Sequence, residues 1–240
     1  DFGVQMNRRL NRLAFIAILF IFSMPFPGSA TGATEQVGVK ILTSPDQIND
    51  FNADLLIDYG SFHWAVVTRG DLSLWDKVNI SYQVFENPYT LTLGGQYFDP
   101  VLQTPSLGRG WEEVQGTDEP GLHLVQFHGP IKSAWREALV LVGLDVLQYI
   151  HPFTYVVWAD TTQLQSISSH DFIRWAGDYL PAYAVQPQNR TLSSDEILVR
   201  ALFYPAAGLQ STLDSLQALG SNQIETASSA DPAFDLLTFY

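Results

Sequence analysis

The clearest pattern of apolar and polar positions lies between residues 122 and 185. Alternating or short apolar runs predict strands at 122–127, 146–150, 154–158 and 173–176. Apolar residues at helical spacing follow Ser133 and Asp160, which are predicted to be the N-caps of two helices, and Gly143 is placed to end the first helix. The element order is β-α-β-β-α-β. It predicts a four-stranded sheet with both helices on one face, the ferredoxin-like plait.

The flanking sequences show similar patterns. Strands are predicted upstream at 37–42, 54–59, 62–67 and 80–85, with helices beginning at Ser44 and Arg69. Downstream, strands are predicted at 197–203, 223–225 and 234–239, with a helix over 207–219. The repetition predicts an α+β chain of tandem ferredoxin-like plaits at 36–88, 121–187 and 195–240. The alternative is that strand–helix–strand order recurs only because it is common.

The third plait is predicted to be truncated, because no second helix or fourth strand follows residue 239. We expect it to expose a sheet edge, and residues 234–240 to be its least ordered strand. The stretch 89–120 is rich in glycine and proline, which predicts a linker. Within it, residues 89–93 and 96–98 flank Gly94 and Gly95 and predict a hairpin.

The N-terminal pattern differs from the rest. Met6 precedes Arg8, Arg9 and Arg12, an apolar run covers 13–22, and proline and small residues follow as far as Ala33. This order predicts a secretory signal peptide over 6–33, with translation starting at Met6 and cleavage after Ala30 or Ala33. The apolar run is short for a membrane span, which needs about 20 residues. An uncleaved anchor or a buried helix is the alternative.

Composition supports an exported, folded chain. There is no cysteine, so the core alone must hold the fold without disulfides. After residue 33 the chain keeps nine basic and 24 acidic residues, a net charge of −15. Such a charge disfavours nucleic acid and anionic membranes as partners. We therefore expect a secreted monomer that has no contact with nucleic acid, or with a membrane once the signal is cleaved.

Three segments, 122–131, 145–158 and 173–183, resemble the N-terminal inhibitor-type propeptide region of secreted bacterial subtilisin-like serine peptidases. The resemblance covers the central third best and rests on strand and turn patterns. It implies a plait whose sheet docks on the peptidase and assists its folding, and whose tail enters the substrate cleft. The residues it assigns to this docking sheet and tail are Tyr155, Val157, Trp175, Tyr179 and Tyr183.

Catalytic signatures are missing from the sequence. No subtilase triad segment, Gly-x-Ser-x-Gly elbow, P-loop or dinucleotide fingerprint occurs, so we assign no catalytic residue and no cofactor. The histidines lack the usual spacing of metal ligands, and half-exposed sheet positions explain them better; they are His63, His123, His128, His151 and His170.

Aspartates and tryptophans also recur along the chain and could form an acid–base pair or a carbohydrate-binding platform. Asp54, Asp58, Asp145 and Asp160 fall at matching turns of the repeats, where helix capping and strand-end solvation explain them better than paired acid–base chemistry. Five tryptophans could form a carbohydrate platform, but their spacings favour core packing; they are Trp64, Trp75, Trp135, Trp158 and Trp175.

Two functions remain open from the sequence. The first is a non-catalytic pro-region of a secreted subtilisin-like serine endopeptidase, which aids folding and latency of a catalytic domain beyond Tyr240 in the same precursor. The second is a free-standing extracellular binding or adhesion module of tandem plaits.

Overall fold

The computed structural model describes residues 35–42, 53–107, 111, 119–190 and 197–240. The expected signal peptide and the helix expected to begin at Ser44 lie outside these residues. The described residues have a mixed α and β structure, with several small antiparallel sheets and few helices. No helix in these ranges is long and apolar enough to cross a membrane.

The central sheet contains the strands that the sequence pattern predicts. Its strands are β7 (Gly121–Phe127), β8 (Asp145–Ile150), β9 (Thr154–Ala159) and β10 (Ile173–Asp178), in the order β10-β7-β9-β8. The predicted helices are α2 (Ser133–Val142) and α3 (Thr161–Ser168). Gly143 ends α2 with a φ of 93°, and Asp160 forms a capping box with Gln163 at the start of α3. The predicted caps at Gly143 and Asp160 are thus confirmed. The N-cap predicted at Ser133 is wrong, because Lys132 precedes α2 in an extended conformation and Ser133 is already the first residue of the helix, whose N-terminus has no side-chain capping hydrogen bond.

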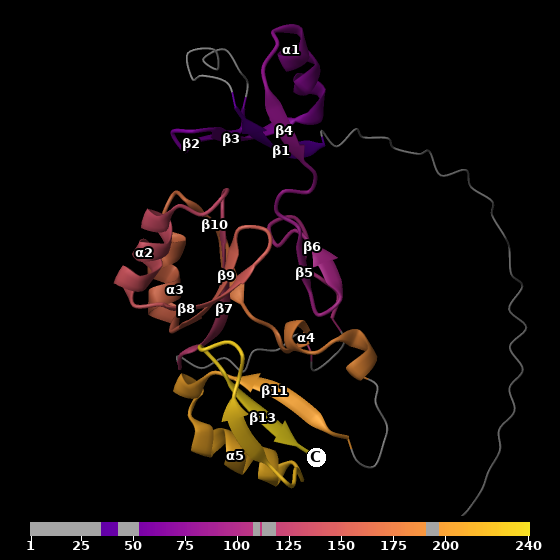
Figure 1. Cartoon of the computed structure of the whole chain (residues 1–240), viewed down its shortest axis with the longest axis vertical. Helices are drawn as coiled ribbons and strands as arrows, with labels where there is room; N and C mark the ends of the chain where they lie inside the picture. Colours follow the sequence, from indigo (N-terminus) through magenta and orange to yellow (C-terminus); the bar gives the residue numbers. More distant parts are fainter. Residues whose placement is uncertain (1–34, 43–52, 108–110, 112–118, 191–196) are drawn as a thin grey trace, which may run out of the picture. The chain divides into compact units, whose positions relative to one another are not determined.

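The two faces of the central sheet are covered by different layers (Figure 1). One face packs on α2 and α3 through a core that includes Val125, Phe127, Leu139 and Ile167. The opposite face packs on the hairpin of β5 (Leu91–Leu93) and β6 (Gln96–Phe98) and on α4 (Pro181–Ala184). The predicted hairpin is confirmed. It lies against the sheet, so this part of the glycine-rich stretch is a covering layer of the central unit.

The first sheet repeats the strand order of the central one. Its strands are β1 (Gln36–Ile41), β2 (Leu55–Asp58), β3 (His63–Thr68) and β4 (Tyr82–Phe85), in the order β2-β3-β1-β4. The turn η2 (Arg69–Asp71) and helix α1 (Leu72–Lys77) connect β3 to β4. Val37, Val39, Ala65 and Trp75 belong to its buried core. In both sheets, the third strand of the unit and the fourth strand flank the first.

Among the residues that the structure describes, the last sheet has the same order without a fourth strand. Its strands are β11 (Val199–Phe203), β12 (Glu225–Ser228) and β13 (Asp235–Phe239), in the order β11-β13-β12, and α5 (Leu209–Ala218) follows β11. The final strand, β13, is therefore central and is paired on both sides. Residues 234–240 are expected to be the least ordered strand if they lie at an exposed edge of the sheet. The two edge strands are instead β11 and β12, so the structure does not support that reason.

Candidate functional site

A β-bulge in β10 creates the main polar site of the central unit. Opposite β7, Ile173 pairs with Phe127 and Trp175 pairs with Gln126, which leaves Arg174 as an extra residue between them. The bulge changes the alternation of side chains, because Ile173 packs on the helix side whereas Trp175 packs on the hairpin side. The Arg174 side chain consequently meets Gln126 of β7 and Asp99, the residue that follows β6.

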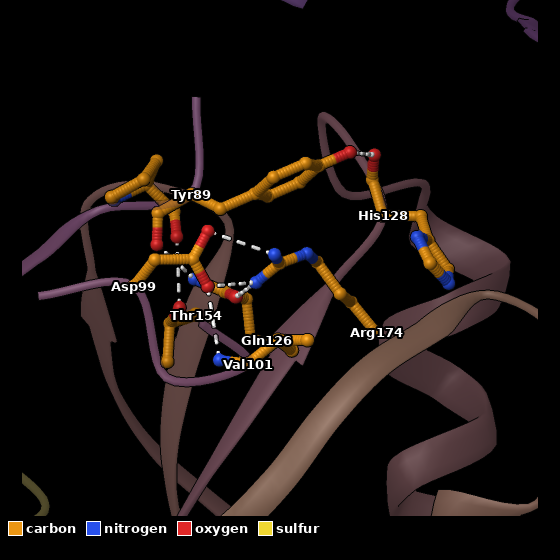
Figure 2. Close-up of polar contacts among 8 residues, drawn as sticks. Tyr89, Asp99, Val101, Gln126, His128, Thr154 and Arg174 are labelled. Carbon is orange, nitrogen blue, oxygen red and sulfur yellow. Dashed lines mark hydrogen bonds and ion pairs between the residues drawn. The ribbon is translucent and has the colours of Figure 1, made fainter. Parts of the chain in front are cut away.

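The guanidinium of Arg174 makes three hydrogen bonds within the chain, shown in Figure 2. Its Nη1 and Nη2 donate to the two carboxylate oxygens of Asp99 at 2.7 and 2.8 Å, and Nη1 also donates to Gln126 Oε1 at 2.7 Å. The Arg174 and Asp99 side chains are only 11% and 13% exposed. This is the bidentate geometry in which an arginine–carboxylate pair is strongest.

Tyr89 extends the site towards the end of β7. Its ring lies under the Arg174 guanidinium, 4.0 Å from the centroid, and its hydroxyl donates to the His128 carbonyl at 2.7 Å. Gln126 Nε2 donates to the Tyr89 carbonyl at 3.0 Å. Burial raises the pKa of Tyr89 to about 12. Burial, and then the charge of Arg174, lowers the pKa of His128.

A second arginine holds the tip of the hairpin. Arg190 Nη2 donates to the Gly94 carbonyl at 2.8 Å and also to the carbonyl of Ala182 in α4. Its Nε donates to the Val185 carbonyl at 3.0 Å. Gly94 has a φ of +51°, and a Cβ there would lie 1.9 Å from the Ala182 oxygen. Glycine is therefore required at this contact by both backbone conformation and space.

The chemistry available at this site is limited, because its charged groups are occupied by one another. Arg174 is paired on its Nη1 and Nη2 atoms, and Asp99 accepts on both carboxylate oxygens while Oδ1 also accepts from the Val101 N–H. A buried, mutually satisfied pair holds elements together and leaves no free cation for an anionic ligand. We conclude that the site fastens the hairpin and its following loop to the central sheet.

Comparison with known proteins supports the central region as a unit. A family described as a domain of unknown function, DUF8729, matches residues 92–180, which is less than half of the chain. The match begins in β5 and ends just after β10, so it includes Asp99, Gln126 and Arg174. No curated protein and no solved structure matches the chain.

The five residues assigned by resemblance to a docking sheet and tail lie on two different faces. Tyr155 and Val157 belong to the core beneath the helices, where Val157 is fully buried. Trp175, Tyr179 and Tyr183 pack on the hairpin side, where burial raises the pKa of both tyrosines. The structure does not bring the five together on one surface, and the hairpin covers the sheet face that carries Trp175.

The histidines weighed as metal ligands are dispersed. Among the described residues, no group of three or more His, Cys, Asp or Glu side chains could hold a metal ion. His63 Nε2 lies 3.4 Å from Asp58 Oδ1, and His123 Nδ1 lies 3.1 Å from Asp178 Oδ1. These are two separate pairs on different sheets.

The repeated aspartates take individual structural roles. Asp160 accepts a hydrogen bond from the Gln163 N–H at the start of α3, as its capping position predicts. Asp58 accepts from the Gly60 N–H, and Asp54 accepts from the Gln36 side chain. Asp145 accepts from the Tyr204 hydroxyl at 2.7 Å. None of these contacts joins two carboxylates.

The tryptophans mostly fill cores. Trp64 and Trp75 are buried, and Trp175 packs in the core beneath the hairpin. Trp135 and Trp158 are partly exposed and lie against the rings of neighbouring aromatic residues. Two of the five, Trp64 and Trp75, are buried, and the partly buried Trp175 and Trp135 pack against the cores on opposite faces of the central sheet. The five tryptophans therefore do not share one surface as a platform would require.

Sequence reasoning missed Arg174, Asp99 and Arg190. A lone arginine inside an apolar strand, Ile173-Arg-Trp175, was the available signal, because a buried arginine needs a carboxylate partner. The partner is 75 positions away in the chain. No spacing rule in the sequence connects the two.

Proposed function

We propose that this chain is a non-catalytic, exported module of tandem ferredoxin-like plaits that acts by binding another protein. The observation that carries the proposal is the state of the polar site. The most buried ion pair among the described residues, Arg174–Asp99, is used to hold the chain's own layers together. A partner would therefore contact the sheet and helix surfaces of the described residues, because the buried charged site is already occupied.

The plait assignment is supported by strand order. The sheets of three or four strands all place the third strand of the unit beside the first, and the two four-stranded sheets place the fourth strand on its other side. Every strand pairing among the described residues is antiparallel, as the β-α-β-β-α-β order requires. Because such a scaffold hosts many functions, the binding role rests on the surfaces and not on the fold.

We propose as the partner a subtilisin-like catalytic domain in the same precursor, which the chain would help to fold and hold inactive. The support is the sequence resemblance of the central unit. The covered sheet face limits how this can happen, because the hairpin occupies the face that a pro-region would dock. Binding then uses another surface of the chain, or the hairpin must first leave the sheet.

The test is a refolding experiment with residues 34–240 and a denatured subtilisin-type catalytic domain. We expect a higher yield of active peptidase with the chain present, and inhibition of the refolded enzyme on further addition. The control is the same chain unfolded by prior heating and kept from refolding. Equal yields with and without the folded chain, together with no inhibition, would refute the pro-region role and leave the extracellular binding module.

A further inference from the structure

The hairpin layer that covers the central sheet presents three apolar side chains to solvent. In β6, Phe98 packs in the core beneath the hairpin, whereas the preceding Tyr97 is 66% exposed. In the turn that follows β6, Val101 is 52% exposed and Leu102 is 74% exposed. We call Tyr97, Val101 and Leu102 the hairpin surface. Exposed apolar side chains grouped in one short segment mark a contact site more often than scattered ones do.

The turn that carries Val101 and Leu102 is held in one geometry by Asp99. The Asp99 carbonyl accepts hydrogen bonds from the N–H groups of Leu102 and Gln103 at 3.1 and 2.9 Å, and its Oδ1 accepts from the Val101 N–H at 3.0 Å. The same carboxylate is fastened to the central sheet by Arg174 (Figure 2). Side chains on a fixed turn lose little conformational freedom on binding, so this turn is suited to a contact surface.

The segment that forms the hairpin surface is electrically neutral. Within residues 96–107 the one charged side chain is Asp99, and Arg174 neutralises it in a nearly buried pair. The segment therefore offers no exposed charge that could pair with a charged group of a ligand. The surface complementary to it is apolar and uncharged, which is the character of the buried centre of a protein–protein interface.

A second exposed apolar pair on the central unit has different surroundings. Val140 and Leu141 of α2 are 53% and 87% exposed. One turn earlier on the same helix face lie Arg136 and Glu137, which are also exposed. Single apolar residues beside charges are common on a solvated helix surface. This pair is therefore the matched control for the hairpin surface.

We propose that the hairpin surface is the site through which this chain docks on the catalytic domain, and that it contacts an apolar, uncharged surface there. The inference rests on the proposed function for the identity of the partner. The sheet face that a pro-region would dock is covered by the hairpin, so the outer side of the hairpin is what this layer presents instead. Leu102 is the most exposed of the three side chains and serves as the anchor of the contact.

The experiment measures binding of residues 34–240, the compact part of the chain, to a folded subtilisin-type catalytic domain. The nucleophilic serine of that domain is changed to alanine, so that the chain is not cleaved during the measurement. Biolayer interferometry gives the affinity. We expect it to change by less than about twofold between roughly 0.05 and 0.5 M NaCl, because an apolar contact is little affected by salt. Amide exchange of the bound chain should slow over residues 97–103 and stay unchanged over α2.

Two double variants locate the site. V101S/L102S removes the apolar side chains of the turn and keeps Asp99 with its hydrogen bonds, and we expect it to weaken binding about tenfold or more. V140S/L141S makes the same exchange on α2 and should bind within about twofold of the unaltered chain. Urea unfolding checks that both variants are folded. If V101S/L102S does not fold, the exchange map of the unaltered chain still decides whether residues 97–103 are the contact.

Several results would overturn the inference. They are unaltered affinity of a folded V101S/L102S, protection of another surface in place of residues 97–103, affinity that falls steeply with salt, and a dimer of the chain that V101S/L102S abolishes, which would make a second copy the occupant. The proposed function is tested separately. Binding that V101S/L102S leaves intact refutes the hairpin surface alone. Binding through it without any gain in refolding refutes the folding role alone, and a chain that neither binds the domain nor aids its refolding refutes both.

Discussion

At the scale of single residues, one inserted position decides the layout of the central unit. The bulge at Arg174 changes which face the end of β10 presents and brings a cation to Asp99 and Gln126. The arginine is stable there because its Nη1 and Nη2 atoms are both hydrogen-bonded and because the Tyr89 ring lies 4.0 Å from it. Arg174 therefore contributes to the stability of the fold, and the free energy of unfolding is the quantity that measures this contribution.

Substitution R174M should destabilise the chain strongly, because it leaves the Asp99 carboxylate buried without a cation. Loss of one partner of a buried pair costs about 3 to 5 kcal/mol in the free energy of unfolding. Urea unfolding followed by tryptophan fluorescence measures it. R136M changes an exposed arginine of α2 and should stay within about 0.5 kcal/mol of the unaltered chain.

A double variant sharpens this prediction. R174M/D99L removes both charges, so its cost should be clearly smaller than the sum of R174M and D99L measured alone. Additive costs would mean that the two side chains contribute independently, against the geometry described above.

His128 should make stability depend on pH in the acidic range. Its pKa is lowered in the folded chain by burial and by Arg174, so the unfolded chain binds its proton more readily. Stability is then complete above the unfolded pKa of about 6.5 and is lost as the pH falls through the interval below it. H128Q should reduce this loss in urea titrations between about pH 7 and 5. Identical slopes for H128Q and the unaltered chain would contradict the assignment.

At the scale of elements, hydrophobic periodicity predicted where strands and helices lie but not which layers they join. The hairpin of β5 and β6 was recognisable from Gly94 and Gly95. Its position against the central sheet could not be predicted from the sequence. The apolar residues Leu91, Leu93 and Phe98 indicate that the hairpin is buried, but not which surface it contacts. The candidate site was missed for the same reason, since a bulge and a partner 75 residues away leave no local pattern.

Substitution G94A should displace the hairpin tip. The alanine Cβ would meet the Ala182 oxygen, so the variant adds a backbone collision to the cost of a positive φ. G60A is the matched control, because Gly60 has a φ of +77° with nothing within 4 Å of the added Cβ. We expect G60A to cost about 1 kcal/mol and G94A to cost at least about 2 kcal/mol more. Thermal unfolding of both variants measures the difference, and equal midpoints would show that the tip is not held against α4.

At the scale of the whole chain, three sheets share one strand order and differ in what covers them. The first and central sheets have four strands and buried cores, whereas the last has three strands and little buried apolar surface. The family match over residues 92–180 includes the hairpin together with the central sheet. The family match and the shared core indicate that the hairpin belongs to the central unit.

Removing the hairpin should expose a large apolar face. A fragment of residues 86–190 should unfold cooperatively, whereas residues 119–190 should bind the dye ANS and aggregate, because Leu91, Leu93 and Phe98 no longer cover Leu124 and Val156. Each buried side chain of this size contributes about 1.5 to 3 kcal/mol. The control is residues 34–190, which lacks only the last unit and should bind no more ANS than 34–240. A cooperative, ANS-free fragment 119–190 would show that the hairpin is dispensable.

The sequence by itself determined the local order of this protein. Strand and helix positions, the caps at Asp160 and Gly143 and the hairpin turn all follow from short-range rules of periodicity, capping and φ preference. The tertiary structure alone decided the pairing of Arg174 with Asp99 and the covering of the central sheet by the hairpin. The physical reason is that burial and ion pairing act between surfaces brought together from distant parts of the chain, and a pattern within one segment records that a surface is apolar but not what it meets.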